Sequence, residues 1–320
     1  ACKDSEVQFN NLSSAPVGDI AKSEWNFGDG SPLLTVTTLA PVFHTYTSYA
    51  TFTVTLTVTT NDSCKRTITL PVEILPNPGA DFSYLTSCVN TPVQFDDLSQ
   101  AGAGGLAGWS WNFGDPPSGT NNVSTLENPI HLYNAPGTYQ VALIVSNTGG
   151  CSDTIVKPVL VHGLPGVDFT SSPGCVDDST QFVSSTFVNA GAVVSRLWDF
   201  GDGFTSPDID PFHIYASSGS FTVSLTVTDT AGCSNTVTHT VAIVPPPTSF
   251  FQISTQTCAN TPVFFTNLSS TPGGTITSYF WEFGDGSDTL INAPATGNIS
   301  HIYAVAGTYT VTLTINTSLG

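Results

Sequence analysis

The sequence predicts an all-β protein of four tandem sandwich domains, and three observations lead to this prediction. A Trp-x-Phe-Gly-Asp motif occurs four times, at intervals of 86, 87 and 83 residues (111 − 25, 198 − 111 and 281 − 198). Long segments alternate strictly between apolar residues and Thr, which is the period of a β-strand. No segment shows the period of a helix. Because each interval suits one small all-β unit, the 320 residues indicate an array of domains rather than one large fold.

The repeated motif predicts a strand followed by a tight turn. Its copies are Trp25–Gly30, Trp111–Pro116, Trp198–Gly203 and Trp281–Gly286. Trp and Phe two positions apart point to one face of a strand, so both are expected in the core. Gly-Asp-Gly then supplies the turn, with Gly for a positive φ and Asp to bond its own backbone.

The other elements follow in one order. An opening strand carries a Phe, at residues 80–82, 167–169 and, more loosely, 249–251. A second strand ends in Phe9, Phe95, Phe182 and Phe265. A His-x-Tyr strand follows the turn, with its histidine at His44, His131, His213 and His301. The longest strand is expected at 51–59, 138–146, 220–228 and 308–316, and a last strand such as 236–244 closes the repeat.

The expected domains are 1–75, 76–162, 163–246 and 247–320. Proline-rich joints between them are extended and stiff, so a rod is expected. By the phase of the repeat, the first domain lacks its opening strand and the fourth its last strand, so a longer parent array is expected. The second cysteine follows the aromatic of the long strand by 12 residues (64 − 52). Counting 12 from Tyr309 gives position 321, where we expect a cysteine that pairs with Cys258.

The composition narrows the class of partner. Acidic residues number 24 and basic residues 6, for a net charge of −18. Without a basic stripe, binding to nucleic acid or to an anionic membrane is not expected. No apolar run of 18 residues exists, so no membrane span is expected in this window. The acidity suits solubility outside the cell, and divalent cations could bind.

The seven cysteines fall in phase with the repeat and match no zinc template. They are Cys2, Cys64, Cys88, Cys151, Cys175, Cys233 and Cys258. A regular pattern of two per domain predicts disulfides and therefore an oxidising compartment. The favoured frame is within domains, as Cys2–Cys64, Cys88–Cys151 and Cys175–Cys233. The alternative frame links neighbouring domains, as Cys64–Cys88, Cys151–Cys175 and Cys233–Cys258.

Trp-x-Phe-Gly-Asp-Gly, His-x-Tyr and Gly-Thr-Tyr-x-Val-x-Leu at this spacing resemble the PKD (polycystic kidney disease) domain family, over essentially the whole chain. The resemblance implies an immunoglobulin-like β-sandwich that serves as a spacer, ligand-binding or cell-surface module and not as a catalyst. The cysteine-bearing version is similar to arrays in secreted surface adhesins of Bacteroidetes-type bacteria. Repeat 2 departs from the pattern at Pro116-Pro117, so its turn must differ.

Two kinds of candidate site remain. Ser, His and Asp all occur, but a histidine and an aspartate in every repeat indicate a structural role, because an enzyme needs one constellation. The turn aspartates could instead hold calcium weakly, although turn capping is favoured because calcium needs several clustered carboxylates. These aspartates are Asp29, Asp115, Asp202 and Asp285. Trp109, Tyr84 and Phe204 could stack on sugars, but ordinary loop packing is favoured.

The sequence therefore predicts a non-catalytic, extracellular structural or adhesive array, a segment of a longer surface or filament protein. Its expected partners are other copies of itself, further repeats of the same chain, or a cell-surface or polysaccharide ligand. No cofactor is expected apart from the calcium just considered. The alternative is a set of accessory substrate-binding or spacer modules of a secreted hydrolase.

Overall fold

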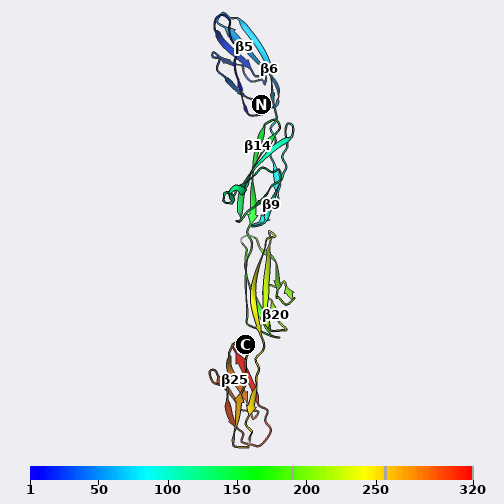
Figure 1. The fold of residues 1–320 in the computed structure, drawn as a ribbon, viewed down its shortest axis with the longest axis vertical. Helices are drawn as coiled ribbons and strands as arrows, with labels where there is room; N and C mark the ends of the chain where they lie inside the picture. The colour runs from blue at the N-terminus through cyan, green and yellow to red at the C-terminus, as the bar shows by residue number, and fades with distance from the viewer. Residues whose placement is uncertain (189–190, 256–257, 319–320) are drawn as a thin grey trace. The chain divides into compact units, whose positions relative to one another are not determined.

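The computed structural model describes residues 1–188, 191–255 and 258–318, and it is all-β as the sequence predicts. Each repeat forms two β-sheet layers of its own (Figure 1), mostly antiparallel, with the short edge strands β8 (Ser87–Cys88) and β16 (Gly174–Cys175) pairing parallel. The chain divides into two compact units, 1–163 and 164–320, each holding two repeats. No helix in the described ranges has the length and apolar character needed to cross a membrane.

Repeat 1 has a small and a large sheet. The small sheet pairs β1 (Glu6–Phe9) with β4 (Val42–Thr45). The large sheet runs in the order β3 (Leu34–Val36), β2 (Ile20–Asn26), β5 (Ala50–Thr60) and β6 (Lys65–Ile74).

Repeat 2 adds an opening strand to the small sheet. Its order is β12 (Ile130–Leu132), β9 (Pro92–Asp97) and β7 (Phe82–Tyr84). The large sheet is β11 (Val123–Ser124), β10 (Leu106–Asn112), β13 (Gly137–Asn147), β14 (Ser152–His162) and β8 (Ser87–Cys88). The short 3-10 helix η1 (Pro116–Asn122) follows the motif, so the prediction of a different turn at Pro116-Pro117 is confirmed.

Repeat 3 has the same two layers. Its small sheet is β15 (Gly166–Ser171), β17 (Ser179–Phe187) and β20 (Phe212–Ile214). Its large sheet is β16 (Gly174–Cys175), β22 (Ser234–Val244), β21 (Gly219–Asp229), β18 (Val193–Asp199) and β19 (Thr205–Ser206).

Repeat 4 has two three-stranded sheets. They are β23 (Phe251–Ile253), β24 (Pro262–Asn267) and β27 (Ile299–Ile302), and β26 (Asp288–Asn292), β25 (Ile276–Glu282) and β28 (Thr312–Thr317). The long strand predicted at 308–316 is therefore wrong in its first half. In repeats 1 to 3 that half pairs with a last strand, for example Phe221 with Val241. Residues 308–311 have no such neighbour in the described chain and form no ladder.

The register of the motif strand is the same in all four repeats. Each Trp lies opposite a Leu of the long strand, as Trp25–Leu56, Trp111–Leu143, Trp198–Leu225 and Trp281–Leu313. A fixed register keeps every apolar side chain on the inner face, since a one-residue slip would turn them all outward. The buried Trp, Phe and Tyr side chains accordingly form a core within each repeat, as the separate clusters of repeats 1, 3 and 4 show.

Candidate functional site

The Gly-Asp turn forms as the sequence predicts. Gly28 has φ +80°, and a Cβ there would lie 2.5 Å from the carbonyl oxygen of Thr53, so only glycine fits. The Asp29 carboxylate accepts from the backbone N–H of Ser31 at 3.1 Å, which closes the turn.

The turn aspartate also pairs with the repeated histidine. The Asp Oδ2 to His Nε2 distances are 2.7 Å for Asp29–His44, 3.1 Å for Asp115–His131, 2.6 Å for Asp202–His213 and 2.7 Å for Asp285–His301. One contact made four times indicates a structural element of the repeat, which confirms the prediction for these histidines.

Ring stacking fixes each histidine in place. The ring lies flat on the motif Phe, with centroids 4.0 Å apart for Phe27–His44 and 4.4 Å for Phe113–His131. The next tyrosine meets the same ring edge-on, and its hydroxyl donates to the carbonyl of the motif Phe, for example from Tyr133 to Phe113 at 2.9 Å. We call the Asp, His, Phe and Tyr side chains of one repeat its turn cluster.

The turn cluster shifts the pKa of its own members. Burial raises the pKa of Asp29, but hydrogen bonds from Ser31 and His44 outweigh burial and lower it to about 2. Hydrogen bonds from Ser287 and His301 lower the pKa of Asp285 to about 2. Burial, with the nearby Asp29 charge, raises the pKa of Tyr46 to about 12. The carboxylates are thus held charged and the phenol neutral.

The cluster of repeat 4 contains Ser, His and Asp, but not in the geometry of a hydrolytic triad. A triad places the acid and the nucleophile on opposite ring nitrogens of the histidine. Here Asp285 Oδ2 and Ser287 Oγ both face His301 Nε2, at 2.7 and 3.4 Å. Ser287 donates its proton to Asp285 Oδ1 at 2.5 Å. The serine is therefore a turn cap and not an activated nucleophile.

The aspartates offer few free ligands for calcium. Both oxygens of Asp29 and of Asp285 are already engaged by Ser and His. In repeat 3 the additional acid Asp210 accepts from the Ser184 N–H. Over residues 1–188, 191–255 and 258–318, no group of three or more His, Cys, Asp or Glu side chains is placed to hold a metal ion. Calcium binding stays a prediction.

The cysteines pair in neither predicted frame. Cys2 bonds Cys151, with Cα atoms 5.5 Å apart, so repeat 1 is covalently joined to repeat 2. Cys64 cannot reach Cys2, because the two cysteines lie at opposite ends of β6. Cys64 precedes this strand, whereas Cys2 forms a β-bridge with Leu75, which directly follows the strand. The ten residues between extend about 30 Å, and a disulfide needs Cα atoms within about 7 Å.

The junction explains why Cys151 is the partner. Cys151 lies in the turn between β13 and β14, and its N–H donates to Asn147 Oδ1 at 3.0 Å. The Asn147 amide in turn donates to the Pro76 carbonyl of the joint at 3.4 Å. Cys88 and Cys233 are disulfide-bonded as well. Cys64, Cys175 and Cys258 carry free thiols, contrary to the predicted frames.

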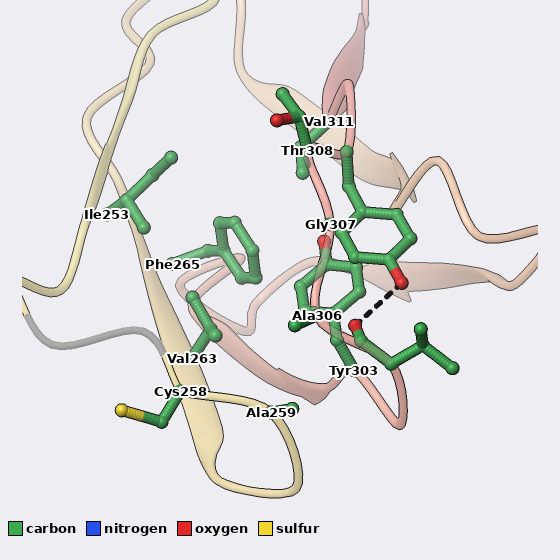
Figure 2. Close-up of a pocket in the computed structure, with 12 residues that line it drawn as sticks. Ile253, Cys258, Ala259, Val263, Phe265, Tyr303, Ala306, Gly307, Thr308 and Val311 are labelled. Carbon is green, nitrogen blue, oxygen red and sulfur yellow. Dashed lines mark hydrogen bonds between the residues drawn. The ribbon is translucent and has the colours of Figure 1, made fainter.

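The remaining candidates offer no reactive constellation. Figure 2 shows a pocket in repeat 4 that is lined by Val263, Phe265, Tyr303 and Val311, with the Cys258 thiol at one side. Its described lining includes no Asp, Glu, His, Lys or Arg side chain. Trp109 and Tyr84 lie in strands rather than the loops predicted, and their polar atoms are engaged by Asp97 and by the Pro158 carbonyl. Phe204 is exposed.

Four β-sandwiches, each with its own core and turn cluster, define a tandem array of immunoglobulin-like modules. The family model of the PKD domain matches residues 1–74, 76–161, 165–244 and 243–320. The chain therefore belongs to the PKD domain family, and its modules are non-catalytic.

The regions that this chain matches are small parts of longer proteins. A microbial collagenase of Vibrio alginolyticus is 46% identical over 89 residues, which are 27% of this chain and 11% of the relative. Human polycystin-1 is 25% identical over 295 residues, 86% of this chain and 6% of the relative. The PKD1 domain from the Vibrio cholerae metalloprotease PrtV is a solved structure at 35% identity and a TM-score of 0.24, covering 25% of this chain and 96% of that domain. The finer resemblance to Bacteroidetes adhesins stays a hypothesis.

Proposed function

We propose that this chain is an accessory segment of a secreted hydrolase. It binds a protein substrate such as collagen, or it holds the catalytic domain at a set distance from that substrate. The sequence left two hypotheses, a structural array of a surface protein and a set of accessory modules of a secreted hydrolase. The similarity to PKD regions of a collagenase and a metalloprotease supports the second. A disulfide is consistent with a location outside the cell.

The observation that carries the proposal is the 46% identity to the collagenase, over about the length of one repeat. The PKD domain model matches four segments along the chain, so we infer that the chain contributes attachment or distance rather than bond cleavage. The sheet faces and loops provide the contact area.

The test is co-sedimentation of the full chain with fibrillar collagen, with microcrystalline cellulose as the control surface. We expect retention in the collagen pellet, none on cellulose, and no collagen fragments on electrophoresis. Retention on neither surface would refute the binding role, and collagen fragments would refute the non-catalytic assignment.

A structural segment of a surface protein is the second candidate, and the Cys2–Cys151 bond favours it. A covalent link across the joint resists extension of repeats 1 and 2, which an extended stalk under load requires. Single-molecule pulling of the full chain with and without reductant tests this. We expect the unfolding of the repeats to release more length under reductant, because the intact bond keeps the residues between Cys2 and Cys151 out of the load path; an unchanged trace would remove the support.

A further inference from the structure

Strand β12 of repeat 2 has one side without a neighbouring strand. It ends the order β12, β9, β7 of its sheet in the described chain. The Phe95 N–H donates to the Pro129 carbonyl at 3.0 Å, so in this antiparallel register His131 also belongs to a hydrogen-bonded pair. The N–H and C=O groups of Ile130 and Leu132 therefore point away from β9. Unpaired main-chain groups of this kind are a template for a further strand.

The segment that follows the motif turn of repeat 2 is held firmly in place. It forms η1, which is the one helical segment of the described residues. The Asn122 side chain accepts from the Asp115 N–H at 2.7 Å and donates to Asn112 Oδ1 at 3.1 Å. The Ser118 N–H donates to the Asp115 carbonyl at 2.9 Å. Because the chain's own bonds hold η1, little further ordering is required when a partner binds beside it.

A groove lies between β12 and η1. Its volume is about 570 Å³, which is within the usual range of ligand pockets. Ile130 and Leu132 line it from β12, and Pro117 and Val123 line it from the segment after the turn. Ile130 and Val123 are 62% and 58% exposed. The described lining has no Asp, Glu, Lys or Arg side chain, and the side chain of its His131 is 3% exposed and already paired with the turn aspartate.

The lining of the groove sets the chemistry of the occupant. A strand added to β12 would alternate its side chains between the outer face of the sheet, beside Ile130 and Leu132, and the groove. Apolar side chains suit the outer positions. A charged side chain in the groove would lose water without gaining a partner. A second copy of the chain would bring a further net charge of −18, which opposes its close approach. The occupant that fits is an extended, uncharged polypeptide with apolar side chains at alternate positions.

We propose that the groove between β12 and η1 is the site at which this chain binds an extended, uncharged segment of a protein substrate. The segment adds to the sheet as a further strand beside β12. Main-chain bonds to Ile130 and Leu132 supply affinity, and the alternate side-chain positions supply specificity. The partner class rests on the function proposed above, since it takes the ligand to be a protein substrate.

The test adds a capped heptapeptide of alternating valine and threonine to the full chain. Calorimetry measures its affinity, and hydrogen exchange of residues 116–124 and 128–134 locates the site. We expect a peptide with aspartate in place of every threonine to bind at least about tenfold more weakly, because the groove offers its charges no partner. Ile130→Pro removes one outward N–H but no bond to β9, and should weaken binding of the first peptide about tenfold.

The matched control is Phe212→Pro in repeat 3. Phe212 follows Pro211 and precedes His213, which is the same local order as at Ile130. Strand β20 is also the edge of its sheet, but the two-residue strand β19 follows the motif turn there in place of η1. Phe212→Pro should therefore leave peptide binding unchanged. Unchanged exchange outside the substituted strand shows that each variant folds, and the aspartate peptide tests the unaltered chain.

Three results would overturn the proposal. They are no binding of the valine–threonine peptide, equal binding of the aspartate peptide, and loss of binding in Phe212→Pro but not in Ile130→Pro. A concentration-dependent dimer in light scattering, with residues 128–134 protected in the absence of peptide, would overturn the assignment to a substrate in favour of a second copy.

Co-sedimentation with collagen separates this proposal from the function proposed above. Retention of the unaltered chain on collagen without binding of the peptide would overturn the groove and leave the collagen-binding role standing. Binding of the peptide at residues 128–134 without retention on collagen would support the groove and refute the collagen-binding role alone.

Discussion

The turn clusters of repeats 2 and 4 share their residue types but differ in burial. In repeat 2 the side chains of Asp115 and His131 are 9% and 3% exposed. In repeat 4 the side chains of Asp285 and His301 are 24% and 18% exposed. The cause is the segment after the turn, because η1 follows the turn in repeat 2 and Asn122 of that helix accepts from the Asp115 N–H at 2.7 Å. The same motif is therefore expected to contribute differently to the stability of the two repeats, because the loops beside it differ.

The strand behind the turn differs as well. The motif glycine of repeat 2 packs on Gln140, which β13 holds between β10 and β14. The equivalent glycine of repeat 4 packs on Thr310, which lies outside β28. Behind the turn, the backbone of repeat 2 is therefore fixed by strand pairing on both sides, whereas the backbone of repeat 4 lacks this pairing and can shift.

The largest expected effect follows from this difference. A Cβ on Gly114 would lie 2.5 Å from the Gln140 carbonyl oxygen at φ +69°, so Gly114→Ala should destabilise repeat 2 by about 3 kcal/mol. Gly284→Ala meets Thr310 at 2.4 Å but should cost less, because Thr310 can shift. Hydrogen exchange of the full chain, followed by mass spectrometry, measures each repeat separately.

The matched control for these variants is Gly286→Ala. Gly286 has φ +94° and nothing within 4 Å of the added Cβ, so strain alone should cost about 1 kcal/mol. Equal effects of Gly114→Ala and Gly284→Ala would show that strand support does not matter.

The next effect concerns the buried pair. Asp115→Ala removes the partner of the buried His131 ring nitrogen, which should destabilise repeat 2 by about 2 kcal/mol. Asp285→Ala should have a smaller effect, since water can reach His301. Chemical denaturation of the full chain, with exchange of peptides from each repeat, gives both values. Asp115→Asn keeps an acceptor and serves as the control; a loss as large as that of Asp115→Ala would argue against the hydrogen bond.

Much of this fold could be predicted from the sequence because the relevant signals are local. Alternation of Val and Thr fixes the long strands, and Gly28 with Asp29 fixes the turn, since each depends on residues within a few positions. The Asp–His pair could also have been found, because His44 and Asp29 recur together in every repeat. Repetition marks both as parts of one structural unit.

The disulfide could not be predicted in this way. Cys2 and Cys64 are in phase along the chain, but phase does not reveal that β6 separates them to opposite ends of the sandwich. The pairing depends on distances between elements, which sequence spacing does not encode.

Acid should weaken the exposed cluster through its carboxylate. The pKa of Asp285 falls from 3.8 to about 2 in the folded chain, because Ser287 and His301 bond its charged form. The unfolded chain then binds the proton first, so this contribution is present above pH 3.8 and is lost as the pH falls toward 2. Thermal melts between pH 2 and 5 should show a shallower decline for Asp285→Asn. An identical slope in both proteins would rule out this carboxylate as a source of the acid sensitivity.

The smallest expected effect is that of calcium removal, and it applies equally to both clusters. Calcium takes six to eight oxygen ligands, but His301 and Ser287 already occupy the oxygens of Asp285, and His131 faces Asp115. A cation would have to displace these bonds at a site with a single carboxylate. We therefore expect thermal melts with calcium and with a chelator to give the same midpoint in every repeat. A midpoint that rises with calcium in repeat 3 alone would instead identify Asp202, Asp208 and Asp210 as ligands, since two further acids follow the turn of that repeat.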